Sequence, residues 1–153
     1  MAYLGRQRKS HKTIFQIKLG KGRENNKQMK NSPYKRLNNR CWKLMSEIVR
    51  RESQGICFTC GTRHDWKTEM DAGHRYHSKL DFDPMNIKAQ CKKCNKYLGG
   101  NLGEYEYNLI KKYGMNETEK LKARASQFVQ YDYLELEEIE KKLKLRMQEL
   151  INE

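Results

Sequence analysis

The stretch "QCKKCNKYLGGN" (Gln90–Asn101) decides how this sequence folds, because it carries two cysteines separated by two residues. An earlier stretch, "CFTCG" (Cys57–Gly61), has the same spacing. Each CxxC loop can present two sulfurs to one ion, and four thiolates suit the tetrahedral coordination of zinc. A thioredoxin-type redox pair is the alternative, but no parallel βαβ pattern surrounds either CxxC. We therefore predict one structural zinc ion, held by Cys57, Cys60, Cys91 and Cys94.

The charge of the chain is concentrated at one end. Its 153 residues, enough for one domain, carry 32 Lys and Arg against 19 Asp and Glu. The first 50 residues hold 14 of the basic residues and only 2 of the acidic ones. Such an excess is typical of proteins that neutralise nucleic-acid phosphates, so we expect a nucleic-acid partner. A merely solubilising tail is the alternative, although solubility does not require one sign this dominant.

The sequence offers no segment for a membrane and no secretory signal. No apolar run approaches the roughly 20 residues of a membrane span. No apolar signal region follows the first methionine. Paired CxxC motifs in such a chain favour a metal site over disulfides.

A long helix is expected to begin with "SPYKRLNNRCWKLMSEIVRRESQG", where Ser32 can cap and Pro33 suits the first helical position. Gly55 is the expected end. A buried face is indicated by apolar residues at spacings of 3, 4, 4 and 3, namely Tyr34, Leu37, Cys41, Met45 and Ile48. Cys41, the fifth cysteine, is therefore interpreted as a core thiol.

Further helices are expected after each of four polar residues in the second half of the chain. Asn95 begins a short one that breaks at Gly99, and Asn101 can cap the next. Capping boxes are predicted for Asn116 with Glu119 and for Asp132 with Glu135. The last helix repeats apolar residues at 3, 4, 4 and 3, which predicts a packing helix or a dimer contact: Leu136, Ile139, Leu143, Met147 and Leu150.

These patterns divide the chain into four segments. Residues 1–31 form a basic, partly flexible arm, in which "KTIFQIKLG" (Lys12–Gly20) alternates like a short strand. Residues 32–55 form a helix that packs on the core, residues 56–114 the zinc-stabilised core, and residues 115–153 the C-terminal helices. The fold class is therefore α+β.

The 30 residues between the two CxxC motifs (61–90) are more than a plain zinc ribbon needs. A histidine, then an asparagine, then CxxC and a polar residue is the order that a ββα-metal (HNH-like) nuclease requires. The residues in question are His64, Asp71, His74, His77, Asn86 and Asn95. Phosphodiester hydrolysis needs a base for the attacking water, and a neutral imidazole can serve. It also needs a divalent cation held by hard oxygen ligands, which Asp and Asn side chains provide.

The stretch "DAGHRYHSKLDFDPMNIKAQCKKCNKYLGGNLGEYEYNLIKKYG" (residues 71–114) resembles the bacteriophage NinG/Rap recombination proteins. The resemblance covers about residues 55–114 and rests on "DAGH" and "QCKKCNKYLGGN" occurring in that order. It implies a structure-specific endonuclease that cuts branched DNA, such as Holliday junctions and D-loops, in the cytoplasm of a bacterial host. The wider resemblance is to endonuclease VII-like and other zinc-containing HNH enzymes.

Carried over residue by residue, the resemblance assigns His74 as the general base and Asn95 as the last ligand of a catalytic Mg²⁺ or Mn²⁺. Asn86 matches the structural asparagine that fixes the histidine. Asp71 is the expected second ligand, although many HNH enzymes place the acid directly before the histidine, where this chain has Gly73. Because side chains alternate along a strand, Asp71 lies on the opposite face from His74. It either ligates through a bend at Gly73 or orients a neighbour.

Further residues are expected to contact DNA. Arg75, His77 and Asn101 are candidates for phosphate or metal contact. Phosphate contacts are also expected from the lysines beside the helix that begins at Asn95 and from the arm, namely Lys92, Lys93, Lys96, Arg6, Arg8, Lys9 and Lys12. Spacing two sites across a branch favours a homodimer, by family analogy.

Two other interpretations remain open. The first is a non-catalytic zinc module that binds branched or single-stranded nucleic acid without cutting it. The second is a recombination adaptor whose acidic C-terminal helix recruits a partner, so that removing residues 132–153 would abolish function.

Overall fold

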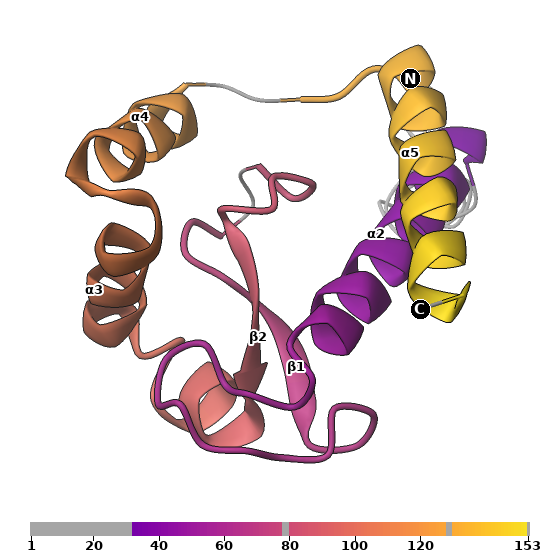
Figure 1. Ribbon diagram of the computed structural model, residues 1–153. Helices are drawn as coiled ribbons and strands as arrows, with labels where there is room; N and C mark the ends of the chain where they lie inside the picture. The colour runs from indigo at the N-terminus through magenta and orange to yellow at the C-terminus, as the bar shows by residue number, and fades with distance from the viewer. Residues whose placement is uncertain (1–31, 78–79, 128–129, 153) are drawn as a thin grey trace, which may run out of the picture. The chain divides into compact units, whose positions relative to one another are not determined.

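The computed structural model describes residues 32–77, 80–127 and 130–152 (Figure 1). The chain divides into two units, Met1–Arg36 and Leu37–Glu153, and the second contains nearly all the described elements. The fold is α+β with these elements in order: α2 (Pro33–Glu52), β1 (Met70–His74), β2 (Ile87–Cys91), η1 (Lys93–Tyr97), α3 (Leu102–Tyr113), α4 (Met115–Ser126) and α5 (Tyr133–Asn152). The predicted arm and its strand Lys12–Gly20 lie outside the described residues.

Helix α2 begins as its sequence predicts. The Ser32 hydroxyl accepts a hydrogen bond from the Lys35 backbone N–H at 3.2 Å, and Pro33 occupies the first position. The buried face is Leu37, Cys41, Met45, Ile48 and Val49. The predicted stripe is thus confirmed except at its first member, Tyr34, which is only half-buried. The helix ends at Glu52, three residues before the predicted Gly55.

Strands β1 and β2 form a two-stranded antiparallel sheet. Met70 pairs with Cys91 at one end of the hairpin, and His74 pairs with Ile87 at the other. One face of the hairpin packs on α2 in a cluster of buried residues, namely Met45, Val49, Cys57, Met70, Ile87, Ala89, Cys91 and Cys94. Three of the four CxxC cysteines therefore belong to the hydrophobic core.

A second cluster joins α3 to α4. Its buried members are Leu80, Tyr105, Leu109, Leu121 and Ala125. The Tyr105 hydroxyl reaches the hairpin, where the carbonyls of Asn86 (3.0 Å) and Gly73 (3.3 Å) share its one hydrogen. Burial raises the pKa of this phenol well above its usual range, so Tyr105 stays a neutral donor.

The predicted helix caps have mixed outcomes. The capping box of Asp132 and Glu135 is confirmed, because each side chain accepts the other's backbone N–H at 2.8 Å. The box at Asn116 is wrong, since α4 begins one residue earlier, at Met115, with Gly114 before it. Asn101 does precede α3, but it has a left-handed backbone (φ 46°) and makes no side-chain cap bond.

Helix α5 packs along α2 (Figure 1). The Cys41 thiol donates to the Leu136 carbonyl at 3.4 Å, which confirms Cys41 as a core thiol. Ion pairs join Arg40 to Glu140 (2.6 Å) and Arg146 to Glu52 (2.7 Å). Of the predicted stripe, Leu136 and Met147 are buried, whereas its other members are half-buried. Deleting residues 132–153 would therefore disturb the core as well as any recruitment surface.

Among the described residues, none of the helices is long and apolar enough to cross a membrane.

Gly55 is required by the turn that follows α2. Its φ is +81°, and a Cβ there would lie 2.2 Å from the His64 carbonyl oxygen. We predict that Gly55→Ala lowers the free energy of unfolding by about 3 kcal/mol, because left-handed strain and a backbone clash add together. Gly99→Ala is the matched control: its φ is +56° with open space around it, so a loss of about 1 kcal/mol is expected. Denaturant unfolding of both variants measures the difference, and equal losses would contradict the clash.

Candidate metal centre and neighbouring pockets

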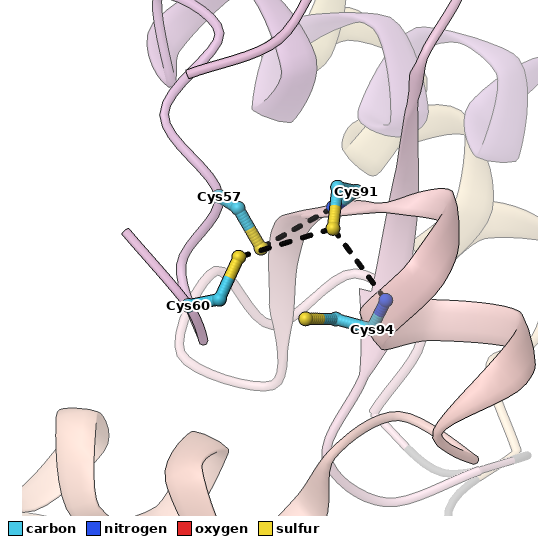
Figure 2. Close-up of side chains that lie close together, drawn as sticks. All are labelled: Cys57, Cys60, Cys91 and Cys94. Carbon is cyan, nitrogen blue, oxygen red and sulfur yellow. Dashed lines mark hydrogen bonds between the residues drawn. The ribbon is translucent and has the colours of Figure 1, made fainter. Parts of the chain in front are cut away.

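The four CxxC cysteines converge in the structure (Figure 2). All their sulfurs lie within 4.8 Å of one another, and the Sγ atoms of Cys60 and Cys91 are 3.9 Å apart. Tetrahedral zinc with bonds of about 2.3 Å separates its sulfurs by about 3.8 Å, so the spacing fits. All four are free thiols, and only Cys60 is exposed. The predicted cluster is confirmed as a group that could hold a zinc ion.

Hydrogen bonds to the sulfur of Cys57 favour its thiolate, which is the form that binds a metal. Cys57 Sγ accepts the Cys91 backbone N–H at 3.3 Å and lies 3.3 Å from the Thr59 hydroxyl. Burial raises the pKa of Cys57, but the N–H of Cys60, the Thr59 hydroxyl and the N–H of Cys91 outweigh it and lower the pKa to about 6. Burial, together with the neighbouring thiols, raises the pKa of Cys91 to about 12. A bound cation would favour the thiolate there, because its charge offsets both effects.

The second knuckle brings Asn95 to β1. Asn95 follows Cys94 inside η1, and its Nδ2 donates to Asp71 Oδ2 at 3.2 Å. Lys96 Nζ lies 3.5 Å from the same carboxylate oxygen. Asp71, Asn95 and Lys96 line a pocket of about 410 Å³ together with Trp42, Ser46 and Arg50 of α2. The structure thus brings together both predicted ligands of the catalytic cation.

His74 lies at the end of β1 and contacts α2. Its ring stacks on Trp42 with centroids 4.8 Å apart and an interplanar angle of 17°. Its Nε2 lies 3.5 Å from Asp81 Oδ1, and the His77 ring is 5.5 Å away. These groups line a pocket of about 290 Å³.

His74 and the Asp71–Asn95 pair therefore line two pockets rather than the single one that the sequence leads us to expect. Trp42 lines both pockets. In the part of the chain that the structure describes, His74 makes no hydrogen bond to either residue of the pair. Strand alternation accounts for this, since it sends the side chains of Asp71 and His74 to opposite faces of β1.

Asn86 holds together the connection between the two strands. It is fully buried, and its Oδ1 accepts the Tyr76 backbone N–H at 2.8 Å. Its Nδ2 donates to the carbonyls of Tyr76 (3.1 Å) and Leu80 (3.3 Å). These bonds hold the segment that follows His74 in place. A structural asparagine is what the resemblance implies for position 86.

The predicted DNA-contacting residues fall into three groups. Arg75 pairs with Glu106, with Nε 2.9 Å from Oε2, and its side chain is only 18% exposed, so it is not free for a phosphate. Asn101 donates to Cys94 Sγ at 3.9 Å, and Lys92 donates to the Thr68 carbonyl. Among the described candidates, those exposed on the surface are His77, Lys92, Lys93 and Lys96. The residues of the arm lie outside the described part: Arg6, Arg8, Lys9 and Lys12.

Three residues escaped the sequence reasoning: Trp42 and Asp81, which line these pockets, and Gln90, which lies in β2. Trp42 lies on the helix before the first knuckle, and its position in the sequence gives no sign that it meets His74. Asp81 sits in a turn-rich loop that would hold acidic residues in any case. Gln90 gave no signal either, because alternation along a strand places a polar residue beside a buried cysteine in any case.

A larger pocket, of about 820 Å³, lies elsewhere. Its lining is mainly apolar, with Lys88, Lys111 and Lys112 among its cations. None of Asp71, His74, Asn86 and Asn95 lines it, so its size is no guide to the candidate site.

Fold and site together define a small α+β protein with two cysteine knuckles that could hold zinc. The family described as "Bacteriophage Lambda NinG protein" matches residues 4–153, so the chain belongs to the NinG family. It is 34% identical over 80 residues to protein ninG of Salmonella phage P22, 32% to that of Escherichia phage 933W and 31% to that of Escherichia phage lambda. Each match covers 50% of this chain but only 38–39% of the relative. No solved structure matches.

Zinc binding and stability are expected to be lost together. In Cys91→Ser a core thiolate is replaced by a weak ligand, and the free energy of metal binding is part of the free energy of folding. We predict a zinc content near zero by atomic absorption and a clearly lower melting temperature. Cys41→Ser, at the buried thiol outside the cluster, should keep its zinc. Complete zinc loss from Cys91→Ser with an unchanged melt would contradict a structural metal.

Proposed function

We propose that this protein is a metal-dependent endonuclease that hydrolyses phosphodiester bonds in branched DNA, on a core of the ββα-metal type. An antiparallel hairpin followed at once by the short helix η1 has the element order of such a core. The observation that carries the proposal is the contact between Asp71 of β1 and Asn95 of η1, directly after the last cysteine. In that contact a carboxylate and an amide lie together beside a cysteine knuckle that could hold zinc.

Asp71 and Asn95 are the side chains that would hold Mg²⁺ or Mn²⁺. Both offer the hard oxygen ligands that these ions prefer, and the Asp71 side chain is 25% exposed, which leaves room for water. When bound, such an ion supplies charge neutralisation at the phosphate and at the leaving 3′ oxygen. Lys96 is in place to bind an adjacent phosphate oxygen.

His74 is suited to take a proton from water. Stacking on Trp42 restricts its ring, and the Asp81 carboxylate lies 3.5 Å from its Nε2. In the tautomer that carries its hydrogen on Nε2, Nδ1 offers the lone pair that accepts a proton from water. A carboxylate in this position also stabilises the imidazolium that forms when the proton is taken. Asp81 thus orients the base that the sequence assigns.

DNA is the proposed substrate because of the formal net charge of +13 and the exposed lysines of η1. The preference for branched DNA rests on the resemblance to NinG/Rap proteins, and so do the homodimer and the bacterial cytoplasm as the place of action.

A non-catalytic zinc module that binds branched DNA is the alternative. The separation of His74 from the Asp71–Asn95 pair favours it, because a hydrolytic site needs base and cation around one phosphate. Both proposals predict salt-sensitive DNA binding, but only the first predicts cleavage with Mg²⁺ or Mn²⁺. Incubation with four-way, Y-form and linear duplexes, with and without each metal, separates them.

His74→Ala is expected to leave zinc content, melting temperature and DNA affinity unchanged while the cleavage rate falls about 100-fold or more, as loss of a general base commonly does. Single-turnover cleavage of a four-way junction at saturating protein measures the chemical step. His77→Ala is the matched control, because it removes an exposed histidine three residues away. It should weaken DNA binding and leave the saturated rate nearly intact. A His74→Ala protein that cuts as fast as the parent refutes the assignment.

A further inference from the structure

Gln90 is a fully buried polar residue at the end of β2. Its Nε2 donates hydrogen bonds to the Gly100 carbonyl at 2.7 Å and to the Thr59 hydroxyl at 3.2 Å. A carbonyl can only accept, so the nitrogen of this amide must face Gly100 and the orientation of the amide is determined. Its Oε1 consequently points the other way, and it has no hydrogen-bond partner among the described residues. A buried acceptor without a donor costs about 1–3 kcal/mol, which calls for an explanation.

The unpartnered oxygen faces Gly73 and Asn95. A Cβ built on Gly73 would lie 1.9 Å from Gln90 Oε1 and 3.1 Å from Asn95 Oδ1. Because Gly73 has no side chain, both amide oxygens can lie close to it. As they stand, two acceptor oxygens share this space, and neither supplies the hydrogen that the other needs.

The amide of Asn95 stands between Gln90 and Asp71. Its Nδ2 donates to Asp71 Oδ2, while its Oδ1 is the atom near Gly73 and Gln90. Turning this amide by 180° about its last side-chain bond exchanges the two atoms. Nδ2 then faces Gln90 Oε1, and Oδ1 faces the Asp71 carboxylate. In that state Nδ2 can supply the hydrogen that Gln90 Oε1 lacks, and a cation can lie between Oδ1 and the Asp71 carboxylate.

We propose that Gln90 is a positioning residue for the divalent cation of the site described above. Its Oε1 accepts a hydrogen bond from Asn95 Nδ2, and this bond directs Asn95 Oδ1 toward the ion, beside the Asp71 carboxylate. The inference rests on the proposed function, since it assumes that Asp71 and Asn95 are the ligands. In the cation-free state the carboxylate accepts a hydrogen bond from Asn95 Nδ2, and its charge is balanced by Lys96, whose side chain is 59% exposed and free to move away. Residues that orient metal ligands typically contribute 10- to 100-fold in affinity.

The test is Mn²⁺ binding by the zinc-loaded full chain without DNA, followed by calorimetry and by electron paramagnetic resonance. Gln90→Met removes the acceptor while keeping a side chain of similar length. We expect it to bind Mn²⁺ about 10-fold more weakly or worse, with its zinc content unchanged. Wild-type affinity in this variant would overturn the inference and leave the cation site standing. Failure of the parent protein to bind Mn²⁺ would overturn the cation site and the inference together.

Asn95→Asp sharpens the test, because an added charge on a simple ligand should strengthen binding. With Gln90 present, a carboxylate at position 95 faces an acceptor, so we expect Asn95→Asp to bind Mn²⁺ no better than the parent. In the Gln90→Met background the same substitution should improve binding, since the repulsion is gone. Equal effects in both backgrounds would contradict a hydrogen bond between the two side chains.

A measurement on the parent protein covers the case in which Gln90→Met does not fold. The side-chain NH₂ signals of Asn95 can be assigned by their disappearance in the Asn95→Asp spectrum. Saturation with Mg²⁺ should shift these signals and slow their exchange with water, because Nδ2 moves from the half-exposed Asp71 to the buried Gln90. Unchanged signals at saturating Mg²⁺ would contradict the proposed rotation of the Asn95 amide.

Discussion

The rest of the structure depends on the convergence of four cysteine sulfurs from two knuckles that lie 30 residues apart. Three of these cysteines are buried in the cluster that joins α2 to the hairpin. A domain of this size, rich in charge, has a limited apolar core, so a metal held there would add stability that packing alone supplies poorly. The Phe58 N–H also donates to the Ala89 carbonyl at 2.8 Å, which ties the first knuckle to β2.

The four cysteines determine where the candidate ligands of the catalytic cation lie. Because Asn95 follows Cys94 directly, any constraint on the second knuckle also constrains Asn95, and the start of β1 lies within hydrogen-bonding distance. Gln90, on the other side of Cys91, reaches the same place through the interior and ties it to Thr59 of the first knuckle. Both knuckles are thus connected to the residues around the Asn95 amide, and a precise metal site requires such support.

Helix α2 contributes more than packing. Trp42 lines both the pocket of His74 and the pocket of Asp71 and Asn95, and it contacts the ring of the histidine. Helix α5 in turn contacts α2 through Leu136 and two ion pairs, so the C-terminal helix supports the helix that carries Trp42.

The sequence by itself determined the local features: the two knuckles, the buried stripe of α2, the capping box at Asp132, and the opposite directions of Asp71 and His74 on one strand. Each depends on spacing along the chain, which covalent geometry translates directly into direction. Only the tertiary structure decided that Arg75 pairs with Glu106, that Asn101 turns to a cysteine sulfur, and that Gln90 faces Asn95 across Gly73. A periodic pattern states which face of an element is buried, but what lies opposite that face depends on how distant segments pack.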